Sequence, residues 1–330
     1  MAESDFELFD APVPEVTEGQ FLVRNLILAF EPAMRGWLND VKSYVPPVGL
    51  GEVMRASAVG QVVRSRHPDF REGELVSGMF GWQDYAVSDG RDAMMNRLVT
   101  RVPKGVPPEQ TLSALGGTGM TAYFGMIDIG HVQSGDTVLV SGAAGATGSV
   151  AGQIARIRGA SKVVGIAGGA AKCAWLTDEL GFDAAIDYRG EDVFERLREL
   201  FPKGIDLFFD NVGGEILDDA LLNMAQFGRV VICGGISAYN ETELPPGPRN
   251  YMQIVIRRLT VRGFILIDHL AEAERARAEL SAWLASGELR SREDIQEDFE
   301  RVPSTFLRLF RGENIGKQLL RVAEPPLPVK

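Results

Sequence analysis

The feature that most constrains this chain is a glycine-rich octapeptide, residues 141–148, which lies between a short apolar run and a segment with helical spacing. The run at 137–140 predicts a buried strand, and Val150, Ile154 and Ile157 recur at the spacing of one helix face. Glycines let a backbone approach a pyrophosphate, and the start of a helix offers free N–H groups. The arrangement predicts a nucleotide-binding turn; a tight turn without a ligand is the alternative for a glycine-rich stretch taken alone.

The chain around this turn alternates between apolar strands and amphipathic helical stretches. We expect strands at 137–140, 162–167, 184–187, 206–210, 228–233 and 260–266, and helices that start near 147, 170, 191, 216 and 271. Such a run of βα units predicts an α/β fold with a doubly wound parallel sheet of the Rossmann type. Ligands of these sheets bind at the carboxyl ends of the strands, where this chain has loops rich in Gly, Asn or Ser.

The N-terminal part has a different character, with little helical periodicity. Strand patterns at 21–28, 58–63, 74–78 and 82–87 are separated by Pro, Gly and charged turns. A short apolar strand pattern at 316–322 is expected to return to this β-rich domain. The 330 residues suffice for two domains, and we place the boundaries at 1–117 for the β-rich domain, 118–291 for the nucleotide-binding domain and 292–330 for the returning segment.

Composition excludes several classes of function. The net charge of −11 argues against binding to nucleic acid or to an anionic membrane. No run approaches the ~18 apolar residues of a membrane span, and the acidic N-terminus lacks a signal-peptide core, which together favour the cytoplasm. The two cysteines and three histidines have no metal-ligand spacing, so we expect no metal and no catalytic zinc.

The loop after the second strand of the sheet indicates which nucleotide binds. In NAD-binding folds an acidic residue about 20 positions beyond the glycine turn accepts the adenosine ribose hydroxyls. That count leads here to Gly168 and Gly169, and no acid stands there. A carboxylate would repel a 2′-phosphate, whereas Lys172 at the start of the next helix and Tyr188 after the next strand could bind one. The pattern therefore favours NADP over NAD.

Several longer motifs run in order over nearly the whole chain. They are Pro32-Ala33-Met34-Arg35-Gly36, Gly119-Met120-Thr121-Ala122-Tyr123-Phe124-Gly125, Ala143-Ala144-Gly145-Ala146-Thr147-Gly148-Ser149-Val150, Phe209-Asp210-Asn211-Val212-Gly213-Gly214, Cys233-Gly234-Gly235-Ile236-Ser237-Ala238-Tyr239-Asn240, Leu244-Pro245-Pro246-Gly247-Pro248 and Gly312-Glu313-Asn314-Ile315-Gly316-Lys317. With these motifs the chain resembles the zinc-independent medium-chain dehydrogenase/reductases. Within them it is most similar to the branch of prostaglandin and leukotriene reductases and 2-alkenal (double-bond) reductases.

The resemblance implies a GroES-like catalytic domain before the Rossmann domain, NADP(H) as the cofactor, a small enone or alkenal as the substrate and a homodimer joined through edge strands. It assigns the pyrophosphate to the turn and the 2′-phosphate to Lys172 and Tyr188. It places Tyr239 beside the nucleotide and the substrate carbonyl. The remaining cofactor-binding residues that it implies are Gly145, Ala146, Thr147 and Gly148 in the turn, Asn211, Cys233 and Ile236 along the nucleotide, and Phe264 and Leu266 of the last strand with Asn314 near the nicotinamide.

Enone reduction delivers hydride to the β-carbon of a C=C bond conjugated to a carbonyl, so negative charge develops on the carbonyl oxygen. Without zinc ligands, a neutral hydroxyl donor is the natural group to stabilise that oxygen, and Tyr239 is the candidate. Two departures from the family pattern, Ala33 and the segment 41–52, fall where the substrate pocket is shaped. A quinone reductase and an NADPH-binding protein with little turnover remain the alternatives.

Overall fold

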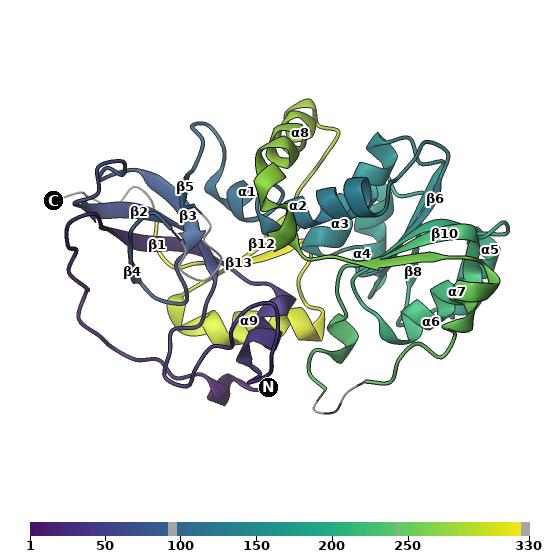
Figure 1. Cartoon of the computed structure of the whole chain (residues 1–330), viewed down its shortest axis with the longest axis horizontal. Helices are drawn as coiled ribbons and strands as arrows, with labels where there is room; N and C mark the ends of the chain where they lie inside the picture. Colours follow the sequence, from purple (N-terminus) through teal and green to yellow (C-terminus); the bar gives the residue numbers. More distant parts are fainter. Residues whose placement is uncertain (92–97, 242, 244, 325–330) are drawn as a thin grey trace. The chain divides into compact units, whose positions relative to one another are not determined.

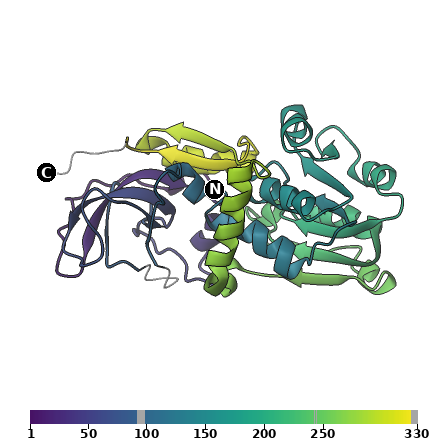
Figure 2. The same ribbon diagram turned by 90° about the horizontal axis from the view of Figure 1, so that it is seen from above.

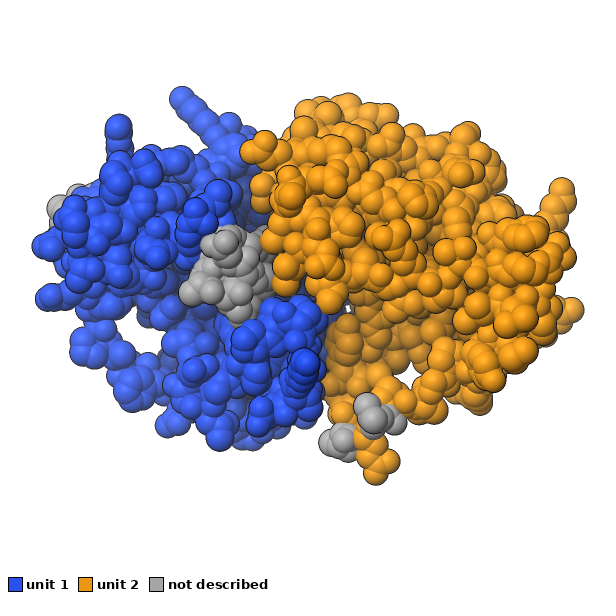
Figure 3. Space-filling view, in the orientation of Figure 1, with its two compact units in different colours: residues 1–112, 293–330 blue, residues 113–292 orange. Residues whose placement is uncertain are grey.

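The computed structural model describes residues 1–91, 98–241, 243 and 245–324, so Leu244 of the resemblance motifs lies outside it. The chain forms two compact units, which Figure 3 shows in blue and orange. Unit 1 combines Met1–Leu112 with Glu293–Lys330, and unit 2 is Ser113–Arg292. Unit 1 is thus built from two pieces of chain that are distant in sequence.

Unit 1 is organised around a mixed sheet whose strand order, among the described residues, is β12-β13-β1-β2-β3-β5, with β4 paired to β1. The C-terminal strand β13 pairs antiparallel with β1 and parallel with β12, so the yellow segment in Figure 2 lies beside the purple N-terminal strand. The strands are β1 (Phe21–Ala29), β2 (Ser57–Ser65), β3 (Leu75–Met79), β4 (Tyr85–Ser88), β5 (Thr100–Arg101), β12 (Glu293–Glu297) and β13 (Lys317–Arg321). Its helices are α1 (Pro108–Leu112), α9 (Val302–Arg311) and 3₁₀ turns at Glu3–Asp5, Pro32–Leu38 and Phe299–Arg301.

Unit 2 contains the predicted parallel sheet, with helices on both of its faces (Figure 1). Its strands are β6 (Thr137–Val140), β7 (Lys162–Ala167), β8 (Ala184–Asp187), β9 (Ile205–Asp210), β10 (Met224–Ile232) and β11 (Thr260–Gly263). The α-helices are α2 (Gly117–Phe124), α3 (Ala146–Ile157), α4 (Ala170–Ala174), α5 (Val193–Leu200), α6 (Gly214–Asn223), α7 (Met252–Ile256) and α8 (Ala273–Ser286). Short π-helical segments at Gly125–Ile129 and Trp175–Glu179 extend α2 and α4, and 3₁₀ turns occupy Ile236–Ala238 and Leu266–Glu272.

The order of strands in this sheet, within the part of the chain described, is β11-β10-β9-β6-β7-β8, and every neighbouring pair is parallel. The chain starts at β6, moves outward through β7 and β8, then crosses back to β9 on the other side of β6. The loops that leave the carboxyl ends of β6 and β9 therefore run in opposite directions across the sheet. The place between these two strands is the switch point where ligands of such sheets bind. The predicted α/β fold is confirmed.

One expectation about the last strand is wrong. The pattern at 260–266 placed Phe264 and Leu266 in a strand, but β11 ends at Gly263. Its partner β10 ends at Ile232, which is in register with Gly263, so the backbone beyond has no neighbour to pair with. Phe264 follows the strand directly and Leu266 begins a 3₁₀ helix instead.

The core of unit 2 explains why its strands could be recognised in the sequence as apolar runs. Leu139, Val164 and Phe208 point from three neighbouring strands to one face, where they pack with Leu197 of α5 and Leu221 of α6. Because successive side chains of a strand alternate, residues such as Val138 and Val163 face α3 on the opposite side. Strands that are buried on both faces appear in the sequence as continuous apolar runs.

Within the described residues no helix is both long and apolar enough to cross a bilayer.

Candidate functional site

The glycine turn is closed by backbone contacts that only glycine permits. The N–H of Gly145 donates to the carbonyl oxygen of Gly142 over 3.0 Å, and a Cβ atom on Gly148 would lie 2.4 Å from that same oxygen. The Ala143 N–H donates to the Ile166 carbonyl, which ties the turn to β7. Helix α3 starts at Ala146, so the N–H groups of its first turn have no acceptor within the helix. This end of a 12-residue helix fits an anionic pyrophosphate.

A buried carboxylate joins the turn to the end of β9. The Ser141 hydroxyl donates to Asp210 Oδ1 over 2.6 Å, and the N–H groups of Val212 and Gly213 donate to the same carboxylate. Burial raises the pKa of the Asp210 carboxyl, and the three donors act in the opposite direction. Sequence reasoning missed this role, although an Asp at a strand's end followed by Asn-Val-Gly-Gly is a turn signal that could have indicated it.

The same group of contacts holds Asn211. Its N–H donates to the Ser141 hydroxyl over 2.8 Å, and its side-chain amide donates to the Ser141 carbonyl over 2.7 Å. The loop after β10 is fixed to the same strand end, because the N–H of Cys233 donates to the Asp210 carbonyl and the N–H of Ile236 donates to the Asn211 carbonyl. Three predicted site residues are thus brought together across β9 and β10.

Tyr239 follows the 3₁₀ turn Ile236–Ala238 of this loop, and its hydroxyl accepts a hydrogen bond from the Gly235 N–H over 3.2 Å. In this bond the phenol oxygen is the acceptor. Nearby, burial and the charge of Asp210 raise the pKa of the Cys233 thiol to about 12. Cys233 therefore stays protonated at neutral pH and contributes packing to the site, without thiolate chemistry.

The two residues predicted to bind the 2′-phosphate, Lys172 and Tyr188, follow β7 and β8. Lys172 is in the first turn of α4, and its N–H donates to the Gly169 carbonyl. Tyr188 follows β8, and a Cβ atom built on Gly168 would lie 2.9 Å from the Tyr188 hydroxyl oxygen. The phenol therefore lies over the turn that ends β7, where an adenosine ribose binds in such folds.

The turn that follows β7 also contacts a carboxylate. The sequence prediction, which expected an acid about 20 positions beyond the glycine turn, did not identify it. Asp187, the last residue of β8, accepts the Gly169 N–H at Oδ1 over 2.8 Å. This bond and a second one from the Arg189 N–H hold the pKa of the Asp187 carboxyl below its usual value. The count missed it because the acid comes from the neighbouring strand and reaches the turn only in the folded sheet.

The predicted nicotinamide residues are divided between the two units. In unit 2, the Phe264 ring packs edge-on against His269, with 6.2 Å between ring centroids, and a Cβ atom on Gly125 would lie 2.8 Å from it. In unit 1, the Asn314 side-chain amide donates to the Gly316 carbonyl over 2.9 Å. The approach of Phe264, Leu266 and Asn314 to a nicotinamide stays a prediction.

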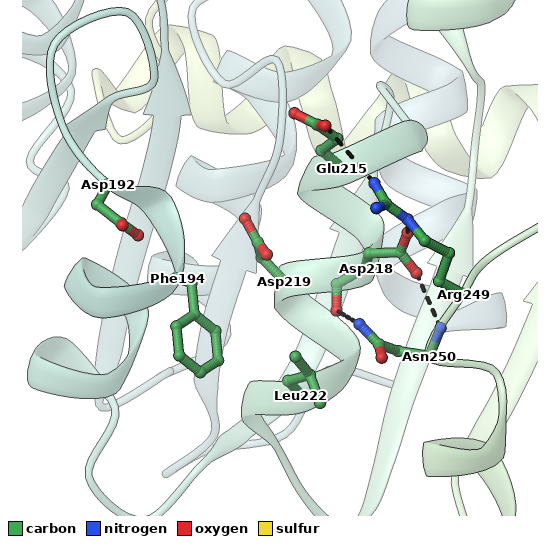
Figure 4. A pocket seen from close by; sticks show the side chains of 8 residues that line it. All are labelled: Asp192, Phe194, Glu215, Asp218, Asp219, Leu222, Arg249 and Asn250. Carbon is green, nitrogen blue, oxygen red and sulfur yellow. Dashed lines mark hydrogen bonds and ion pairs between the residues drawn. The ribbon is translucent and has the colours of Figure 1, made fainter.

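A separate hollow of about 530 Å³ lies between α5, α6 and the segment before α7 (Figure 4). Four carboxylates line it, those of Asp192, Glu215, Asp218 and Asp219, and two of them, Glu215 and Asp218, are paired with Arg249. Burial and the neighbouring carboxylates raise the pKa of Asp219. This charge disfavours an anionic dinucleotide, and no predicted site residue lines the hollow, so the glycine-turn edge of the sheet is the candidate site.

Comparisons with known proteins agree with this geometry. Residues 1–96 match a family described as the N-terminal domain of oxidoreductase, and residues 146–285 match one described as zinc-binding dehydrogenase. An NADPH-dependent curcumin reductase of Escherichia coli is 40% identical over 324 residues, which cover 97% of this chain and 92% of the relative. Prostaglandin reductase 1 of Bos taurus is 38% identical over 321 residues, covering 96% and 94%.

Among solved structures, CurA from Vibrio vulnificus in complex with NADPH superposes with a TM-score of 0.90 at 38% identity, covering 97% of this chain and 94% of that one. The chain belongs to the zinc-independent medium-chain dehydrogenase/reductases. Within that family it falls in the branch that holds the prostaglandin reductases and double-bond reductases, as its motifs predicted. It is therefore an oxidoreductase.

Proposed function

We propose that this medium-chain reductase uses NADPH to reduce the C=C bond of an α,β-unsaturated aldehyde or ketone, with hydride added at the β-carbon and without zinc. The observation that carries the proposal is the Tyr239 hydroxyl, which the Gly235 N–H fixes at the carboxyl edge of the parallel sheet. A neutral phenol at this edge of the sheet can donate a hydrogen bond to a substrate oxygen.

NADP(H) is the cofactor that the residues fit. The N–H groups at the start of α3, which have no acceptor within the helix, suit its pyrophosphate. Gly148 lies so close to Gly142 that it leaves no room for a side chain, and the pyrophosphate can therefore approach the backbone there. Lys172 and Tyr188 supply a charge and a hydroxyl for a 2′-phosphate at the end of β7 and β8. Asp187 turns its carboxylate into the backbone of the turn, where it accepts two N–H groups.

Bound NADPH supplies the hydride when the enzyme is loaded. The chain's own contribution is to hold the substrate carbonyl and to stabilise the negative charge that develops on its oxygen. Tyr239 donates a hydrogen bond to that oxygen, an interaction whose loss typically slows a reaction by ~10²–10³-fold. Asp210 and Ser141 keep the loops after β6, β9 and β10 in one arrangement, so the donor does not need to be reordered during the reaction.

We also propose a homodimer, formed through the free edge of the parallel sheet. The edge strand β11 is exposed along its whole length, and a strand edge presents unpaired backbone groups to another chain. Exposed apolar side chains gather in the same part of unit 2, namely Phe227, Tyr251, Met252, Val255, Ile256 and Val261. A second copy of this chain would cover that surface.

The proposed compartment is the cytoplasm, which suits the two free thiols, Cys173 and Cys233.

The deciding experiment follows NADPH consumption with crotonaldehyde, with a longer enone and with a quinone. NADPH deuterated at the transferable position should place deuterium on the β-carbon of the saturated aldehyde, which mass spectrometry locates. Deuterium on the carbonyl carbon, or turnover with the quinone alone, would replace the proposal by an alcohol-forming or a quinone-reducing enzyme. NADPH binding with no consumption across the panel would indicate a binding protein.

A further inference from the structure

We propose that Arg189 is a second cationic contact for the 2′-phosphate of NADP(H), and so a residue that sets the preference for NADPH over NADH. The inference rests on the proposed cofactor and adds a residue that neither the sequence pattern nor the family resemblance singled out. Three observations carry it: how the turn around Arg189 is built, where its side chain lies and how the neighbouring carboxylates are engaged.

The two loops that would surround the phosphate are joined into one piece. Gly168 and Gly169 follow β7, and Tyr188 and Arg189 follow β8, which pairs with β7 in parallel register. Asp187 Oδ1 accepts the Gly169 N–H over 2.8 Å and the Arg189 N–H over 3.0 Å. One carboxylate oxygen therefore fixes the backbone of Arg189 relative to the turn that receives the ribose.

The Arg189 side chain lies over this turn. A Cβ atom on Gly168 would lie 3.0 Å from Arg189 Nε and 2.9 Å from the Tyr188 hydroxyl oxygen. The guanidinium carbon is 5.9 Å from the centroid of the Tyr188 ring. The guanidinium and the phenol thus lie side by side above a glycine, in space that a larger residue at 168 would take away.

The local charges suit a phosphate at this position. A guanidinium stays charged at all relevant pH values and offers forked N–H donors to phosphate oxygens, while Lys172 adds a point charge from α4. Among the nearby carboxylates, Asp187 accepts two backbone N–H groups and also interacts with the charge of Arg189, while Glu191 is paired with Arg196 at 2.8 Å and accepts the Asp187 N–H. A dianionic 2′-phosphate would meet two cations and a hydroxyl.

The test measures binding by calorimetry, independently of turnover. The probes are NADPH, NADH and the fragment 2′,5′-ADP, and the variants are Arg189→Ala, Arg189→Gln and Lys172→Ala, with Arg198→Ala as the control. Arg198 is an exposed arginine of α5 paired with Glu195. We expect both Arg189 variants to bind NADPH and 2′,5′-ADP roughly ten- to a hundredfold more weakly, the range for a lost hydrogen bond to a charged group. NADH affinity should be unchanged, as should all affinities of Arg198→Ala.

The outcomes separate this inference from the proposed function. If Lys172→Ala weakens NADPH binding while both Arg189 variants behave like the control, Arg189 has no role and the cofactor assignment stands. If the unaltered protein binds NADH as tightly as NADPH, the cofactor assignment fails and the inference with it. If the Arg189 variants lose NADH and NADPH affinity equally, the residue supports the turn and does not read the phosphate. Melting temperatures of the unliganded variants confirm that each is folded.

Discussion

At the scale of single residues, the site depends on what each polar atom already does in the folded chain. Tyr239 accepts a backbone hydrogen bond, Asp210 collects three donors and Asp187 collects two. An acceptor that is engaged in this way is held in one orientation, and a buried carboxylate without such donors would cost several kcal/mol. The sequence motif marked Tyr239, whose partner Gly235 is four residues away, but only the fold brings Ser141 to Asp210 and Gly169 to Asp187.

The first prediction concerns Tyr239→Phe. The change removes the hydroxyl and leaves the ring, so kcat for an enone should fall by ~10²–10³-fold because the developing enolate loses its donor. NADPH affinity should change by less than about threefold, since the cofactor's phosphates are held elsewhere. Steady-state kinetics and calorimetric binding measure the two quantities. Tyr85→Phe, a change on β4 of unit 1, is the control, and an unaltered kcat in Tyr239→Phe would remove the assigned role.

At the scale of elements, the glycine turn and α3 behave as one part because the helix starts against the turn's own backbone. A Cβ atom at Gly148 would lie 2.4 Å from the Gly142 oxygen and 2.8 Å from the Ala143 Cα atom, and neither is the end of a flexible side chain. The turn must therefore open if residue 148 carries a side chain. Local sequence predicted this element well, since its strand, turn and helix are consecutive in the chain.

The second prediction follows for Gly148→Ala. We expect a loss of about 1–3 kcal/mol in the free energy of unfolding, the usual range for overpacking, together with weaker NADPH binding. Denaturant unfolding and calorimetry measure the two effects. Gly36→Ala is a matched control, because a Cβ atom there meets nothing within 4 Å and the glycine has no positive φ. Equal stability of the two variants would show that the turn accommodates the methyl group.

Element boundaries were predicted less well where a strand depends on its neighbour. The pattern of β10 was recognised from residue 228, yet the strand begins at Met224, where it pairs with Ile205 of β9. The opposite error occurred at β11, which stops at Gly263 because β10 offers no further partner. Apolar periodicity reports which face of a segment is buried, but pairing decides where a strand starts and ends.

At the scale of the whole molecule, the third prediction is the proposed homodimer. Sedimentation velocity should give twice the 36.0 kDa mass of the chain for the unaltered protein. The double change Val255→Lys with Val261→Lys should give the monomer, because it places charges on an apolar surface that a second copy would bury. Leu8→Lys, at an exposed apolar residue of unit 1, is the control. A monomeric unaltered protein, or a dimer that survives the double change, would contradict the interface.

The sequence by itself determined the class of fold, the strand, glycine turn and helix at 137–157, and the family, because each depends on residues that are close in the chain. The tertiary structure decided which side chains meet: Ser141 with Asp210 across 69 positions, and Asp187 with Gly169 across 18. The physical reason is the order of strands. Only when β9 pairs with β6 and β8 with β7 do these loops share one edge, and no local periodicity encodes that order.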